Sequence, residues 1–216
     1  MMKRNNFPFS AVLGLNHAKT AILIVLVNPR AGGLLISGPR GIGKSTLMRS
    51  TQELIERPWR DIPVSVTEDR LFGTIDTEKA IYSGQKKLYP GIINEADQGV
   101  LYLDDANLLR EDLLDSILNI AEVGAYQLER DGLSLRCDTS FTVIAAINPE
   151  SGMLSGACLD QFGLFVNVDN IHDENTRVEI LKRTISFEKD CASFCNLWKL
   201  ENEKIKKAIH SAMSLL

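Results

Sequence analysis

The sequence of 216 residues has no long hydrophobic run. Its longest uninterrupted apolar stretch covers residues 21–27 and ends at Asn28-Pro29, far short of the ~20 residues that a membrane-spanning helix needs. Two cations near the N-terminus are not followed by an apolar segment, so no secretory signal is expected, and an Arg- and Ser-rich transit peptide is also lacking. We therefore expect neither a membrane span nor a membrane partner.

Metal-ligating residues and excess charge are also scarce. The cysteines fit no zinc-binding spacing and, without a secretory signal, are expected to be reduced thiols; the histidines form no spaced metal set. Lys and Arg number 24 against 28 Asp and Glu, a net charge of −4, so no basic excess points to nucleic acid as a partner. These residues are Cys137, Cys158, Cys191 and Cys195, and His17, His172 and His210.

What is present is an ordinary globular composition, with 44% hydrophobic and 24% charged residues. Short apolar runs alternate with longer amphipathic segments, which predicts an α/β fold around a mostly parallel sheet. Buried strands are expected at 33–37, 100–103, 141–147 and 164–168. Helices are expected from the apolar periodicity that starts at Leu47 to Arg57-Pro58, along an apolar stripe at 109–120, and over 176–187 and 197–216.

Two segments interrupt this alternation. Residues 72–97 are rich in glycine, polar residues and turn signals. Residues 127–138 predict a β-hairpin, because Asp131-Gly132 separates two runs in which apolar and polar residues alternate.

The strand at 33–37 leads directly into the pattern of a phosphate-binding P-loop, and a helix follows. A polyphosphate is held best by backbone N–H groups at a helix N-terminus, and glycines allow the backbone to approach its oxygens closely. The lysine supplies a catalytic cation for the terminal phosphates, and Ser45 supplies a hydroxyl for Mg²⁺. The predicted nucleotide-binding residues are Gly38, Pro39, Arg40, Gly41, Ile42, Gly43, Lys44, Ser45 and Thr46.

Polar residues follow two other predicted strands. Asp104 is expected to be the Mg²⁺-binding carboxylate at the end of the strand 100–103, and Asp105 to polarise the attacking water. Both acids could instead cap the helix that follows, since Asp is a favoured N-cap residue. Asn148 could orient the water or the γ-phosphate, or could merely end its strand in an Asn-Pro turn; local sequence favours neither.

Ordered motifs over nearly the whole chain resemble the AAA+ ATPase subunit I of magnesium chelatase, and more loosely the cobalt-chelatase and MoxR-type ATPases. The hairpin and Asn148 correspond to that family's pre-sensor-1 hairpin and sensor 1. Such an ordered set is far more specific than a P-loop alone. The matching segments are 7–14, 28–33, 38–46, 67–70, 73–80, 90–91, 104–109, 129–132 and 148–150.

The resemblance implies a P-loop NTPase (AAA+) three-layer sandwich with an insert in its second helix, at 73–80. It implies ATP and Mg²⁺ as cofactors, a ring that is expected to be hexameric, and two partners: an AAA+-like subunit and a porphyrin-binding subunit. In the family, ATP hydrolysis drives insertion of Mg²⁺ into protoporphyrin IX, towards chlorophyll or bacteriochlorophyll. The location implied is the cytoplasm, or the plastid stroma in a photosynthetic eukaryote. We assign residues 1–190 to the nucleotide-binding domain and 191–216 to a helical segment leading toward a lid domain that the chain lacks.

Four departures from the family pattern indicate slow hydrolysis. Asp105 stands where the family has Glu, which retracts the carboxylate by ~1.5 Å, a C–C bond length. Gln161 replaces the candidate arginine finger, Ser155-Gly156 replaces Arg-Pro, and the sensor-2 arginine would lie in the lid beyond Leu216. Arg130 or Arg136 of the hairpin could substitute, but a solvated arginine is the simpler expectation. Two alternatives to a chelatase motor therefore stay open: a hydrolysis-impaired regulatory or structural paralogue, and a MoxR-like chaperone of another metalloenzyme.

Overall fold

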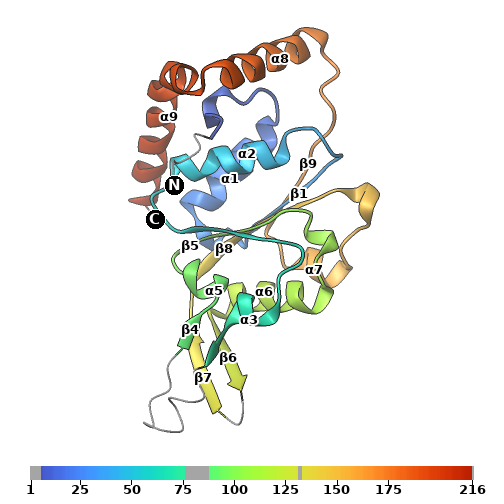
Figure 1. Cartoon of the computed structure of the whole chain (residues 1–216), viewed down its shortest axis with the longest axis vertical. Coiled ribbons are helices and arrows are strands. Elements are labelled where there is room, and N and C mark those ends of the chain that lie inside the picture. Colours follow the sequence, from blue (N-terminus) through green and yellow to red (C-terminus); the bar gives the residue numbers. More distant parts are fainter. Residues whose placement is uncertain (1–5, 76–87, 131–132, 216) are drawn as a thin grey trace.

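The computed structural model describes residues 6–75, 88–130 and 133–215. Its centre is a five-stranded sheet in the order β2-β5-β8-β1-β9, and every neighbouring pair is parallel (Figure 1). The predicted α/β fold with a mostly parallel sheet is therefore confirmed. The strands are β1 (Leu34–Ser37), β2 (Trp59–Ile62), β5 (Gly99–Leu103), β8 (Phe141–Ile147) and β9 (Leu164–Asn167).

The three inner strands, β1, β5 and β8, are buried along their whole length. Because successive side chains of a strand point to opposite faces, each of these strands feeds two separate cores. In β5, Leu101 and Leu103 enter one core, whereas Val100 and Tyr102 enter the other. This alternation produces the three-layer sandwich.

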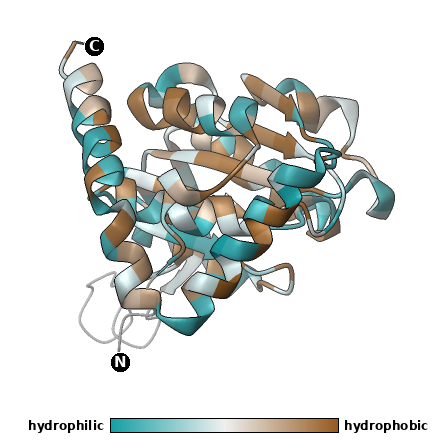
Figure 2. Ribbon diagram, turned by 90° about the horizontal axis from the view of Figure 1, so that it is seen from above, coloured by the Kyte–Doolittle hydropathy of each residue, from teal (hydrophilic) through white to brown (hydrophobic). Residues whose placement is uncertain are grey.

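Helices cover both faces of the sheet (Figure 1). One core contains side chains of α3 (Glu68–Phe72), α5 (Ile92–Glu95), α6 (Glu111–Val123) and α7 (Gly156–Asp160). The other contains side chains of α1 (Asn16–Val27), α2 (Lys44–Thr51) and α9 (Cys191–Met213). Short 3₁₀ turns complete the layers: η1 (Phe9–Ala11), η2 (Pro29–Ala31), η3 (Gln52–Leu54), η4 (Ala106–Leu108) and η5 (Pro149–Ser151). In Figure 2 the helices carry hydrophobic and hydrophilic residues on different faces, as this packing requires.

Several helix boundaries differ from the predicted ones. Regular α2 ends at Thr51 and passes into η3, because the Ser50 and Thr51 hydroxyls both donate to the Leu47 carbonyl. Helix α6 begins at Glu111, so Leu109 of the predicted stripe precedes it. Helix α8 (Glu174–Lys189) is slightly longer than predicted. Helix α9 begins six residues earlier than position 197, because the Asp190 carboxylate accepts a hydrogen bond from the Ser193 N–H and caps it.

Two antiparallel hairpins project from one end of the molecule (Figure 1). The predicted hairpin is present as β6 (Ala125–Arg130) and β7 (Leu133–Asp138), and its turn at 131–132 lies outside the described residues. The second pairs β3 (Gly73–Ile75) with β4 (Leu88–Pro90) inside the segment 72–97. The part of the predicted helix-2 insert at 76–80 lies outside the described residues.

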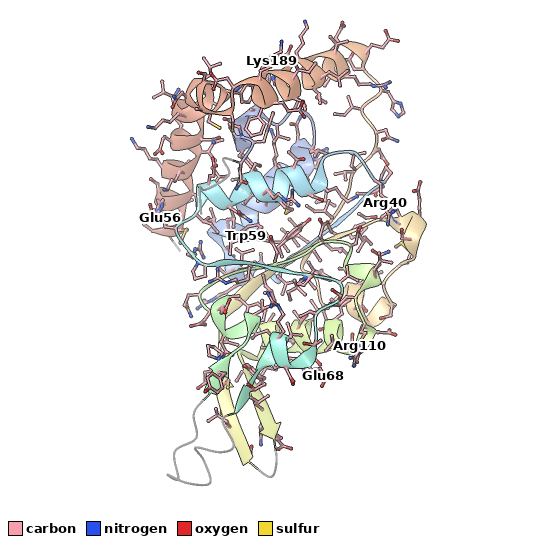
Figure 3. The ribbon with its side chains drawn as sticks, in the orientation of Figure 1. Arg40, Glu56, Trp59, Glu68, Arg110 and Lys189 are labelled. Carbon is pink, nitrogen blue, oxygen red and sulfur yellow. The ribbon has the colours of Figure 1, made fainter. Side chains whose placement is uncertain are left out.

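Helix α9 starts one residue after position 190, where we place the boundary of the nucleotide-binding domain. It packs against the α/β core, where Ile209 is only 4% exposed, and Lys206 forms an ion pair of 2.9 Å with Glu56 (Figure 3). The division into domains remains a prediction. Among the described residues, no helix has the length and apolar character needed to span a bilayer.

Candidate nucleotide-binding site

The first turn of the P-loop is fixed by its neighbours on the sheet. The Gly38 N–H donates to the Ile147 carbonyl at 3.2 Å, so the loop leaves β1 attached to the end of β8. A Cβ atom on Gly38 would lie 2.5 Å from the Val168 carbonyl oxygen and 2.8 Å from Ile42 Cδ1. Only glycine fits between these elements.

Two further glycines shape the turn into α2. Gly41 and Gly43 have φ angles of +82° and +92°, a region that residues with a side chain rarely adopt. A Cβ on Gly41 would meet nothing within 4 Å, so the loop is open on that side, and Gly43 is the N-cap of α2. The loop therefore presents backbone N–H groups at a helix N-terminus, the arrangement that binds phosphate oxygens.

Lys44 lies at the start of α2 and is only 8% exposed. Its Nζ donates to the carbonyls of Gly38 at 2.5 Å and Pro39 at 2.8 Å, which leaves one of the three ammonium donors for a ligand. Burial lowers the pKa of Lys44, and the carboxylates of Asp105 and Asp104 oppose that shift. The ammonium is thus held at the loop by the Gly38 and Pro39 carbonyls.

The two predicted Mg²⁺ ligands are in contact. The Ser45 Oγ donates to Asp104 Oδ2 at 2.9 Å and joins the start of α2 to the end of β5. The buried Tyr102 hydroxyl has no hydrogen-bond partner, and burial followed by the charge of Asp104 raises the pKa of Tyr102. The Ser45 hydroxyl and the Asp104 carboxylate are hard oxygen ligands that suit a cation such as Mg²⁺.

These oxygens alone are too few for a complete coordination shell. In the part of the chain that the structure describes, no group of three or more His, Cys, Asp or Glu side chains is arranged to hold a metal ion. Mg²⁺ binds proteins through one or two carboxylates together with water and substrate phosphates. The residues present therefore fit Mg²⁺ that arrives with a nucleotide.

Asp105 follows in an unusual backbone conformation, with φ 50° and ψ 48°. Its side chain makes no capping hydrogen bond to η4, and α6 begins only at Glu111. Helix capping therefore does not explain this acid. Asp tolerates the left-handed region better than most residues, because its short side chain crowds the backbone less.

Asn148 ends β8 and is 1% exposed. Its Oδ1 accepts from the Glu150 N–H at 3.2 Å, and its Nδ2 donates to the Ser151 hydroxyl at 3.2 Å. The amide thus caps η5, as in the Asn-Pro turn interpretation. Its predicted role toward water or the γ-phosphate would require it to exchange one of these bonds, and that role stays a prediction.

The loop 148–152 is attached to both neighbouring motifs. The Arg40 guanidinium donates to Ser151 Oγ at 3.5 Å; Figure 3 places Arg40 at this end of the sheet. From the other side, Asn107 Nδ2 donates to the carbonyls of Asn148 at 3.1 Å and Gly152 at 3.0 Å. The P-loop, the segment after β5 and the loop after β8 therefore form one connected edge.

A pocket of about 650 Å³ continues from the P-loop. Ile42 and Thr46 line it together with Gly41 and Gly43, and its apolar walls come from the N-terminal segment and from α8. It is large enough for a base and ribose beside the phosphate loop. Its walls include Phe7, Val12, Leu13, Leu15, Ile171, Ile180 and Phe187.

The residues connected with the missing arginine finger, namely Gln161 and Ser155 and the possible substitute Arg136, do not line this pocket. Gln161 is exposed at the end of α7, where its Nε2 donates to the Ala157 carbonyl at 3.4 Å. The Ser155 hydroxyl accepts from the Cys158 N–H and caps α7. Arg136 forms an exposed ion pair with Asp138 at 3.0 Å, in keeping with a solvated hairpin arginine.

Sequence reasoning missed several residues of the site. Glu150 lies close enough for its carboxylate to oppose the lowering of the Lys44 pKa by burial, and Asn107 holds the loop 148–152. Both residues lie within motifs that the resemblance identifies. The sequence therefore placed them near the site, but it did not predict their contacts. Arg49, Arg177 and Arg183 line the pocket, and no sequence signal connected them to the P-loop.

Comparisons with known proteins agree with this geometry. Residues 33–161 match the family model of the AAA domain (dynein-related subfamily). The magnesium-chelatase 38 kDa subunit of Cereibacter sphaeroides is 35% identical over 97% of this chain and 73% of its own length. Magnesium-chelatase subunit ChlI of Cyanophora paradoxa is 33% identical over 100% of this chain and 74% of its own length. The ChlI homologue of Methanocaldococcus jannaschii is 32% identical over 100% of this chain and 69% of its own length.

A solved structure is similar as well. It is a model of the complex between subunits BchI and BchD of magnesium chelatase, based on a cryo-EM reconstruction. The matching chain has a TM-score of 0.72 and 34% identity, over 99% of this chain and 77% of its own length. Sequence, sheet order and P-loop geometry thus lead to one assignment: the chain belongs to the AAA domain family and, within it, to the magnesium-chelatase subunit I family.

Proposed function

We propose that this chain is the ATP-binding AAA+ subunit of a magnesium-chelatase-type complex, which couples MgATP binding and hydrolysis to insertion of Mg²⁺ into protoporphyrin IX. The single observation that carries the nucleotide part is the contact of 2.9 Å between Ser45 and Asp104 beside the buried Lys44. The names of the relatives carry the chelatase part. In a photosynthetic host the pathway served would be chlorophyll or bacteriochlorophyll synthesis.

The residues divide the work at the nucleotide. The backbone of 38–43 and the Lys44 ammonium bind the phosphates, and Ser45 and Asp104 hold the Mg²⁺ of MgATP, which neutralises charge on the phosphates when bound. Asp105 orients and polarises the attacking water, and Asn148 positions it from the loop after β8. The Mg²⁺ inserted into the porphyrin is a separate ion, a substrate of the complex.

We also propose the assembly that the family implies. The chain forms a ring, expected to be hexameric, with an AAA+-like partner subunit and a porphyrin-binding subunit. A similar structure contains two kinds of subunit, BchI and BchD. The expected location is the cytoplasm, or the plastid stroma of a photosynthetic eukaryote; one relative, from Glycine max, is named as chloroplastic.

The test is a calorimetric titration of the purified chain with MgATP, alongside Lys44→Ala. Wild type should bind, and the variant should lose affinity by about 100-fold or more, because a buried charge-assisted contact to phosphate is removed. A chain without affinity for MgATP, or a variant that binds as well as wild type, would refute the nucleotide site. Mg-porphyrin formation with the partner subunits, measured by fluorescence, tests the chelatase assignment separately.

A second candidate is a hydrolysis-impaired regulatory or structural member of the same ring. It is favoured by the exposed, neutral Gln161 and by Asp105, whose carboxylate is one methylene shorter than that of Glu. This candidate binds MgATP but turns it over slowly even with its partners. Single-turnover hydrolysis in the assembled ring separates the two, since a rate typical of AAA+ motors would exclude the impaired form. A MoxR-like chaperone is distinguished by capture of a different partner protein.

A further inference from the structure

The pocket beside the P-loop is strongly cationic for a chain of net charge −4. Three arginines line it, Arg49 from α2 and Arg177 and Arg183 from α8, against a single acidic side chain, Glu188. Positive charge gathered in a concave site attracts an anionic ligand and raises its local concentration. Which arginine binds the ligand depends on what each is doing in the folded chain.

Arg183 is already engaged. Its Nη1 donates to the Ala11 carbonyl at 2.9 Å, its Nε forms an ion pair of 2.9 Å with Glu179, and its guanidinium lies 4.5 Å from the ring centre of Trp198. These contacts attach α8 to the N-terminal segment and to α9. They stabilise the pocket wall, and they leave Arg183 little freedom to reach a ligand.

Arg177 is different. It lies six residues earlier on α8, and the spacing of Arg177, Ile180 and Thr184 places all three on the face that lines the pocket. Among the described residues its guanidinium has no ion pair and no hydrogen bond. An unpaired arginine that shares a cavity with Gly41 and Gly43 has its hydrogen-bonding fork free for an anion.

Arg49 is less well placed. It follows Lys44 by five residues on α2, which corresponds to ~7.5 Å of helix rise away from the turn that binds phosphate. It shares the pocket and the charge of Arg177, but it lies farther from the phosphate-binding turn.

We propose that Arg177 is a nucleotide-binding residue that contacts the phosphate chain from α8, opposite the P-loop. This inference rests on the proposed nucleotide site and deepens it: the α/β domain and α8 together supply the cations for the phosphates. Bound nucleotide therefore holds α8 against the P-loop through a side chain of the same subunit.

The test measures displacement of a fluorescent ADP analogue by AMP, ADP and ATP. Arg177→Ala should weaken ADP and ATP by about 10- to 100-fold and AMP less, the range for a lost hydrogen bond to a charged group. Arg177→Lys should recover part of the loss. Lys182→Ala, an equal charge change on α8 outside the pocket, should stay within about threefold of wild type.

The outcomes separate this inference from the proposed function. If the wild type binds nucleotide and Arg177→Ala binds it with the same affinity, the role of Arg177 is overturned and the proposed nucleotide site is not. An equal loss of affinity in Lys182→Ala also overturns it, because that result reports general electrostatics. Failure of wild type to bind removes the nucleotide site and this inference together. Thermal unfolding of each variant, with Arg177→Gln as a polar substitute, checks that the fold is intact.

Discussion

The two halves of the site are built differently. The half that we propose binds nucleotide, formed by the P-loop, Ser45 and Asp104, is attached to the buried sheet through the Gly38–Ile147 hydrogen bond and the buried Lys44. The half that would drive hydrolysis is looser: Asp105 has a left-handed backbone and no capping contact, and Gln161 is exposed. A site can thus keep its affinity for nucleotide while its catalytic groups change, because the two depend on different parts of the fold.

The largest expected effect tests the packing of the binding half. Gly38→Ala should weaken MgATP binding by about 100-fold, or 2.7 kcal/mol, because its Cβ would lie 2.5 Å from the Val168 carbonyl oxygen and force the loop to move. Gly156→Ala is the matched change in the other half, where a Cβ meets nothing within 4 Å. It should leave affinity within about twofold of wild type. Equal effects in calorimetry would contradict the contrast between the two halves.

The next effect tests the hydrolytic half. Gln161→Arg should raise steady-state phosphate release by about 10- to 100-fold in a ring assembled with its partners, a part of the 10³–10⁵ that an arginine finger contributes. The affinity for MgATP should not change. Gln161→Ala serves as the control and should leave the rate near that of wild type. If Gln161→Arg is no faster, the missing guanidinium does not limit turnover.

The smallest effect tests the contact that joins the P-loop to β5. Ser45→Ala and Asp104→Asn should each reduce the gain in ATP affinity that Mg²⁺ provides by about 5- to 10-fold, since each removes one oxygen ligand. Titrations with Mg²⁺ and with EDTA measure this gain. The double variant should lose little more than either single variant, because both residues serve one ion. Full additivity would show that they act independently.

The sequence predicted the inner strands and the phosphate loop well, because continuous apolar runs and the glycine spacing are local signals. The 141–147 strand is observed with its predicted bounds. The sequence analysis did not predict β2 (Trp59–Ile62), because it is an edge strand whose central residues Arg60 and Asp61 are exposed and polar. It also placed the start of the last helix too late, because the cap at Asp190 comes before the apolar periodicity begins.

The sequence predicted the motif residues of the site but not the pocket walls or the contacts between motifs. Contiguous motifs such as 38–46 and 104–105 can be recognised directly in the sequence. The structure brings Ser45 and Asp104, which are 59 positions apart, into contact. The pocket walls were not predictable, because Arg177 shares a pocket with the P-loop only through the packing of distant segments. The hydrogen bonds of Asn107 depend on tertiary structure in the same way.

The short loop 148–152 has a mechanical consequence. Asn107 and Arg40 each hold it by side-chain hydrogen bonds, and only three residues separate it from the start of α7, which carries Gln161 at its end. Such a short connection has little slack. A change in the position of Arg40 or Asn107 would therefore displace the start of α7, and with it Gln161.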